Sequence, residues 1–81
     1  MKISFYGHLA ELVGREIEIA VPPAAVTVGE MRSLLARLYP HAAGELASLS
    51  LRACVDDRMV AEDFPVAGAG TVAFFPPLSG G

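Results

Sequence analysis

The chain has 81 residues, of which 53% are hydrophobic and 19% charged, and its formal net charge is −3. That length supports one domain, and the apolar content excludes a disordered chain. Six basic residues against nine acidic ones leave no basic stripe for nucleic acid. A single cysteine, Cys54, excludes an internal disulfide and is typical of a cytoplasmic protein.

Neither end of the sequence predicts a membrane segment. The first residues alternate in polarity and reach Glu11 early, so they contain no signal-peptide core. The stretch 64–81 carries no charge, but prolines and glycines interrupt it throughout, which excludes a spanning helix. We therefore expect no membrane partner.

The N-terminal third predicts two antiparallel strands joined by a helical turn. Residues 1–7 alternate between apolar and polar side chains, as in a half-buried strand. Residues 8–14 show short helical spacing and end at a glycine, and residues 15–21 alternate again with Ile17, Ile19 and Val21 facing inward. The prolines that follow lack the N–H that a strand needs, so they end the second strand.

The clearest local pattern is a helix start at Thr27. Thr27 and Glu30 have the spacing of a capping box, in which each side chain binds a free backbone N–H of the other residue. After it, apolar residues recur at helical spacing and predict a buried face of Val28, Met31, Leu35 and Leu38. Pro40 ends this helix, and residues 41–49 predict a second, weaker helical turn.

The C-terminal half predicts three more strands. They cover 51–55, 58–60 and 71–75, with a turn at Asp56-Asp57 and a loop over 64–70. In the last strand Val72 and Phe74 share one face. The order β-β-α-β-β-β gives an α+β fold, in which a mixed sheet of about five strands carries one main helix across one face. We assign residues 1–75 to this domain and 76–81 to an extended tail.

The sequence lacks the usual residues of an independent enzyme. It has no phosphate-binding glycine loop, no Cys–His pair at a catalytic spacing and no clustered metal ligands, so we expect no metal site. Asp56-Asp57 could be a carboxylate pair, although a turn between strands explains both residues better. His8 and His41 fall at the edges of elements, where exposed or capping roles are common.

The last residues are the strongest candidate site. Pro76 and Pro77 favour an extended chain that leaves the sheet, and Gly80 and Gly81 are slim enough for a narrow channel. A frayed end is the simpler alternative. Phe75 points away from Phe74, and we expect it on the open sheet face with Tyr6, Ala73 and Cys54 as neighbours. An aromatic patch at the root of the tail is typical of a docking surface.

These residues resemble the MoaD-type sulfur carriers, the small subunits of molybdopterin synthase. The resemblance rests on the order of elements, on the segment HLAELVG at 8–14 and on the ending VAFFPPLSGG at 72–81. It implies a ubiquitin-like β-grasp fold and a carrier that is not itself catalytic and binds no cofactor. An activating enzyme would adenylate Gly81 with ATP, and sulfur would then convert it to a thiocarboxylate.

The resemblance also implies partners and site residues. The tail would enter the large subunit of a heterotetramer, which supplies the catalytic residues, and deliver sulfur to cyclic pyranopterin monophosphate. Gly80 and Gly81 would be the reacting end, and the partner contacts would be Tyr6, Phe75, Pro76, Pro77, Leu78 and Ser79. Three alternatives stay open: a carrier for another acceptor, such as thiazole or cysteine synthesis, a ubiquitin-like protein modifier, and an interaction module with an inert tail.

Overall fold

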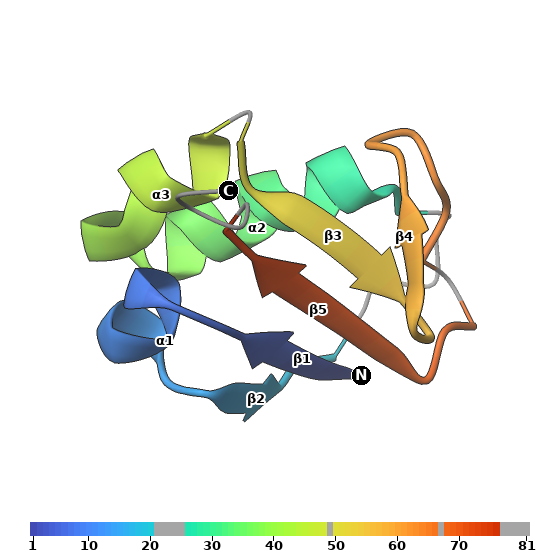
Figure 1. Ribbon diagram of the computed structural model, residues 1–81, viewed down its shortest axis with the longest axis horizontal. Helices are drawn as coiled ribbons and strands as arrows, with labels where there is room; N and C mark the ends of the chain where they lie inside the picture. The colour runs from blue at the N-terminus through green and yellow to red at the C-terminus, as the bar shows by residue number, and fades with distance from the viewer. Residues whose placement is uncertain (21–25, 49, 67, 77–81) are drawn as a thin grey trace.

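The computed structural model describes residues 1–20, 26–48, 50–66 and 68–76. One five-stranded sheet has the order β2-β1-β5-β3-β4, and β1 and β5 at its centre are parallel while the other neighbours are antiparallel (Figure 1). This is the predicted α+β arrangement. The elements are β1 Lys2–Phe5, α1 His8–Val13, β2 Glu16–Glu18, α2 Val28–Leu38, the 3-10 helix η1 Pro40–Ala42, α3 Ala43–Ala47, β3 Arg52–Val55, β4 Arg58–Val60 and β5 Thr71–Phe75.

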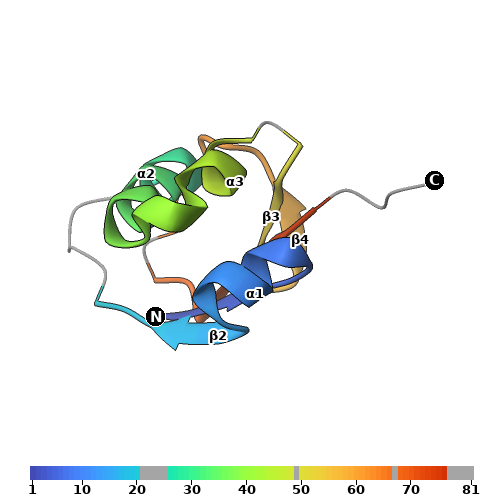
Figure 2. The ribbon, with the colours of Figure 1, turned by 90° about the vertical axis from the view of Figure 1, so that its left-hand side faces the viewer.

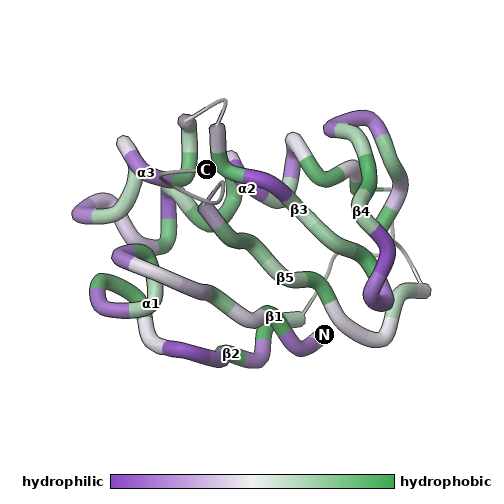
Figure 3. The backbone as a smooth tube through the Cα atoms, in the orientation of Figure 1, coloured by the Kyte–Doolittle hydropathy of each residue, from purple (hydrophilic) through white to green (hydrophobic). Residues whose placement is uncertain are grey.

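The core lies between the sheet and the helices on one side of it. Figure 2 shows α2 and α3 together on that side. Alternate residues of the central strands face the helices and are buried, and Phe5 and Phe74 lie in adjacent strands with ring centroids 6.1 Å apart. Figure 3 shows that the central strand β5 is mostly hydrophobic along its length. The buried apolar residues are Ile3, Phe5, Leu9, Val28, Met31, Leu35, Ala42, Leu46, Leu51, Ala53, Val55, Val66, Val72 and Phe74.

Two expectations need correction. The predicted second strand is shorter than 15–21, because β2 pairs with β1 only over Glu16–Glu18, and Val21 lies outside the described residues. Leu38 was placed on the buried face of α2 but is 53% exposed. The helix ends there, and the non-helical backbone of Tyr39 brings that ring, instead of Leu38, against the core.

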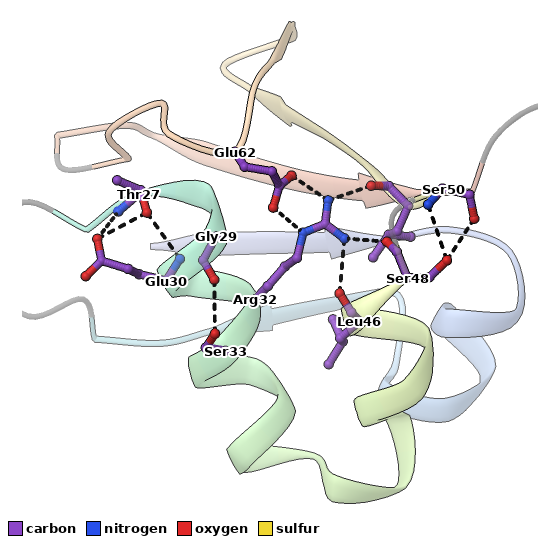
Figure 4. Close-up of polar contacts among 10 residues, drawn as sticks. Thr27, Gly29, Glu30, Arg32, Ser33, Leu46, Ser48, Ser50 and Glu62 are labelled. Atoms are coloured by element: carbon purple, nitrogen blue, oxygen red, sulfur yellow. Dashed lines mark hydrogen bonds and ion pairs between the residues drawn. The ribbon is translucent and has the colours of Figure 1, made fainter.

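The capping box at Thr27 is confirmed. Its hydroxyl accepts a hydrogen bond from the Glu30 backbone N–H, and the Glu30 carboxylate accepts one from the Thr27 N–H (Figure 4). The Asp56-Asp57 turn is confirmed as well, since both residues have positive φ values, 47° and 68°, between paired strands. The Asp56 carboxylate accepts hydrogen bonds from the backbone N–H groups of Gly70 and Thr71, which fixes the start of β5.

Arg32 joins four parts of the fold, and the sequence reasoning missed it. Although it is charged, only 9% of it is exposed. Its Nε and Nη2 donate to the Glu62 carboxylate at 2.7 and 2.6 Å, and its remaining hydrogen bonds go to the backbone carbonyls of Leu46, Ser48 and Leu51 (Figure 4). The guanidinium carbon also lies 5.6 Å from the centre of the Phe74 ring. Arg32 therefore connects α2 to the end of α3, to the chain entering β3, and to the loop after β4.

Two histidines hold α1 against the helical segment 40–47. His8 Nδ1 lies 2.9 Å from Glu45 Oε1, and His41 Nε2 lies 2.7 Å from the Leu12 carbonyl oxygen. The hydrogen bond and charge of Glu45 raise the pKa of His8 above its ordinary value of 6.5. These are the predicted edge positions, and both residues contribute to packing between helices.

The His8–Glu45 contact gives stability a pH dependence. Because the folded pKa of His8 is raised, its contribution is fully present below about pH 6.5 and is lost as pH rises through the folded pKa. We expect Glu45→Gln to lower the melting temperature more at pH 5.5 than at pH 8.5. Thermal melts of both proteins across this range test it, with a change at the exposed Asp63, Asp63→Asn, as a control for a general charge effect. An equal loss at both pH values would contradict the assignment.

Within the described ranges, no helix is both long and apolar enough to cross a bilayer. No group of three or more His, Cys, Asp or Glu side chains among those residues is placed to hold a metal ion.

Candidate carrier surface at the end of β5

The open face of the sheet brings together the side chains that do not face the core. Ala73 of β5 pairs with Ser4 on one side and with Cys54 on the other, and Cys54 pairs with Met59 of β4. The Tyr6 N–H donates to the Phe74 carbonyl at 3.2 Å, which extends the β1–β5 ladder by one residue. The structure thus places Tyr6, Ala73, Cys54 and Phe75 on the same face, as the alternation predicted.

These residues form what we call the open-face patch: Tyr6, Cys54, Met59, Ala73 and Phe75. Tyr6 is 55% exposed and Met59 62% exposed, while the other three are partly buried. Met59 was missed in the sequence because the strand 58–60 is too short to show alternation. The patch itself is largely apolar, and the exposed Arg52, which pairs with Phe75, lies beside it on the same face. The patch ends where the chain leaves β5, so a partner docked on it would lie beside the root of the tail.

Pro76 is the first tail residue and lies against Gly7. A Cβ built on Gly7 would come within 2.9 Å of Pro76 Cγ and 3.3 Å of Pro76 Cδ. Gly7 also has φ +67° and ψ −146°, a conformation that side chains strongly disfavour. Because Gly7 has no side chain, Pro76 can pack closely against it at the point where the chain leaves the sheet. The only sequence signal was a glycine between a strand and a helix, which reads as an ordinary connection.

This contact predicts a coupling between Gly7 and Pro76. Gly7→Ala should lose about 2 kcal/mol of stability from backbone strain and the close contact together. Gly14→Ala is the matched control, because Gly14 also has positive φ but open space around its Cβ. If the contact matters, Gly7→Ala in a Pro76→Ala background should cost about 1 kcal/mol less than alone. Denaturant unfolding measures the cycle, and additive losses would show that only strain matters.

The remaining predicted site residues, Pro77, Leu78, Ser79, Gly80 and Gly81, lie outside the described residues. Near the root of the tail, a cleft of about 630 Å³ lies beside Tyr6 and Gly7 and is also lined by Glu11, Arg15 and Glu16. The described residues of the patch are aromatic, aliphatic or weakly polar. Such a surface can bind an apolar face of a partner beside the root of the tail.

Comparison with known proteins assigns this arrangement to a family. The family model described as "ThiS family" matches residues 3–81. The chain belongs to the ThiS family of ubiquitin-like sulfur carriers. This ThiS-family chain is 34% identical over 82 residues to the molybdopterin synthase sulfur carrier subunit of Escherichia coli strain K12, and the match covers 100% of this chain and 99% of that protein.

Solved structures confirm the β-grasp fold of this family member. SAMP1 from Haloferax volcanii matches with a TM-score of 0.81 at 23% identity, covering 99% of this chain and 97% of that one. A second structure, H. volcanii small archaeal modifier protein 1, gives the same TM-score of 0.81 at 20% identity, with 95% of each chain covered. At these identities the likeness establishes the fold.

Proposed function

We propose that the chain is the sulfur carrier subunit of molybdopterin synthase, donating sulfur from a thiocarboxylate at Gly81 to cyclic pyranopterin monophosphate. The observation that carries this proposal is the end-to-end similarity to the E. coli carrier, at 34% identity. The ending at 76–81 supports it, because a slim, uncharged tail suits a narrow catalytic pocket.

The chemistry needs activation of a carboxylate, which is a poor electrophile. An oxygen of the Gly81 carboxylate attacks the α-phosphorus of ATP and pyrophosphate leaves, giving an acyl adenylate. A sulfur nucleophile then displaces AMP, and the thiocarboxylate that results is a good sulfur nucleophile. ATP is used by the activating enzyme, and this chain binds no cofactor in the proposal.

The open-face patch supplies the docking surface for the large subunit. Tyr6 and Phe75 are the aromatic anchors, and Pro76, held by Gly7, begins the path into the partner's pocket. Pro77, Leu78 and Ser79 continue that path. The large subunit provides the acid and base groups for sulfur transfer in a heterotetramer.

Phe75→Ala should weaken binding to the large subunit by about 30-fold or more, as expected for a central aromatic anchor. Val60→Ala, in the edge strand β4, is a control for apolar truncation elsewhere. Isothermal titration calorimetry with the purified large subunit gives the affinity, and melting temperatures show whether each variant is folded. Unchanged affinity in a folded Phe75→Ala protein would place the docking surface elsewhere.

Reconstitution tests the whole proposal. Thiocarboxylated carrier, the large subunit and the pyranopterin precursor should yield the dithiolene product, while carrier with an ordinary carboxylate should yield none. If the thiocarboxylate forms but sulfur reaches only a thiazole or cysteine precursor, the carrier serves another acceptor. If activation leads to isopeptide conjugates on other proteins, the chain is a modifier.

A further inference from the structure

Activation at Gly81 creates an acyl group that amines can attack, and the chain itself offers few amines. We propose that Lys2 Nζ is the amine of this protein that accepts the Gly81 acyl group of a second copy, forming an isopeptide bond. The inference rests on the proposed activation of Gly81, and it names a modification site on the carrier.

Lys2 is the only lysine among the 81 residues. It lies at the start of β1 on the open face, with a side chain that is 44% exposed. Among the residues that the structure describes, its Nζ has one ionic partner, Glu16 Oε1 at 3.3 Å, and the Glu16 side chain is itself 56% exposed. Exposed ion pairs of this kind contribute little free energy and open readily, so Nζ is accessible to an acyl donor.

The α-amino group is the other amine, and the fold occupies it. It donates to the Ile19 carbonyl at 2.8 Å and lies 3.5 Å from Glu18 Oε2. The Met1 side chain beside it is only 5% exposed. An acyl donor could reach the α-amine only if the pairing between β1 and β2 opened at this end, because the Ile19 N–H also donates to the Met1 carbonyl at 3.0 Å.

The position of Lys2 favours a donor from a second copy. Lys2 pairs with Thr71, at the start of β5, whereas the tail leaves from the other end of that strand (Figure 1). The path from Phe75 back to Lys2 covers four strand residues, about 13 Å. Pro76 precedes another proline and is therefore biased to an extended backbone. Six residues, 76–81, can span about 20 Å at most, so reaching Lys2 of the same copy would use most of that length.

The bond-forming step is a simple aminolysis. The deprotonated Nζ of Lys2 attacks the Gly81 carbonyl carbon of the acyl adenylate, the C–O bond to AMP breaks, and the amine proton passes to solvent. The product is an isopeptide bond, with no oxidant or reductant required. It blocks the carboxyl group of the donor copy and withdraws that copy from sulfur transfer.

A C-terminal thioester of the full chain, made by thiolysis of an intein fusion, tests the site without any activating enzyme. The thioester donor carries Lys2→Arg so that it offers no lysine, and it is mixed with an unactivated, isotopically labelled acceptor of native sequence. We expect a labelled–unlabelled conjugate in intact-mass spectra, with the linkage at Lys2 in the digested product. A Lys2→Arg acceptor should give at least tenfold less conjugate, and Glu16→Gln should give more than the native acceptor.

Three results would overturn the inference. One is equal conjugation of native and Lys2→Arg acceptors, which would mean attack by the α-amine. The second is no conjugate at all under conditions where the same thioester acylates free Nα-acetyl-lysine. The third is a cyclised monomer as the main product of a native-sequence thioester. Because the thioester bypasses adenylation, these results are independent of whether the reconstitution experiment succeeds.

Discussion

Deleting Gly81 should reduce product formation by at least about 1000-fold while leaving the melting temperature of the domain unchanged. The deletion moves the terminal carboxylate back by one residue, roughly 3.5 Å. A misplacement of about 1 Å at a reacting atom can already cost about 100-fold. No residue of the described core lies after Phe74, so the fold has no need of the last glycine. Single-turnover assays with the activating enzyme and the large subunit measure the effect at each step.

Gly81→Ala is the matched variant for this deletion. It keeps the carboxylate at the same chain length and adds one methyl group, so its defect should report only on the width of the channel. We expect it to fall between the native protein and the deletion. If the deletion retained activity within tenfold of native, the position of the terminal carboxylate would not limit the reaction, and the proposed insertion of the tail into a narrow pocket would fail.

Replacing Arg32 with methionine should cost about 3 kcal/mol of unfolding free energy, the largest stability loss that we expect from a single side chain here. The change removes the guanidinium hydrogen bonds to the Leu46, Ser48 and Leu51 carbonyls and leaves Glu62 without its cation. For a domain of this size the melting temperature should fall by more than about 10 °C. Denaturant unfolding at pH 7 measures the free energy directly.

Arg37→Met is the control, since Arg37 is exposed near the end of the same helix. It should change stability by less than about 0.5 kcal/mol. Glu62→Gln should be milder than Arg32→Met, because the Glu62 side chain is 52% exposed and water can replace part of the interaction. Equal losses for Arg32→Met and Arg37→Met would mean that the buried hydrogen bonds contribute no net stability.

Sequence patterns captured the elements whose signals are local. The capping box at Thr27 needs only two residues three positions apart, and the alternation of β5 needs five in a row, so both were predictable. Arg32 was not, because on a helical projection an arginine is assigned to the solvent side. Its burial depends on Glu62, thirty residues later, and on carbonyl groups supplied by two other elements.

In the candidate site too, features with local sequence signals were predictable and features that depend on distant residues were not. The tail was recognisable from its residue types, and the outward direction of Phe75 followed from alternation. The contact between Gly7 and Pro76 requires the parallel pairing of β1 with β5, which joins the first and last strands of the chain. No local pattern encodes that pairing. Likewise, Met59 joins the patch only through the register of the hairpin between β3 and β4.

The pairing of β1 with β5 also decides when the open-face patch is complete. Tyr6 belongs to the first strand and Phe75 to the last, so the surface that contains both exists only after synthesis has reached the end of the domain and both strands have docked. A nascent, truncated or partly unfolded chain exposes at most one half of that surface. Under the proposed function, a partner that binds the patch therefore recognises only molecules whose fold is complete.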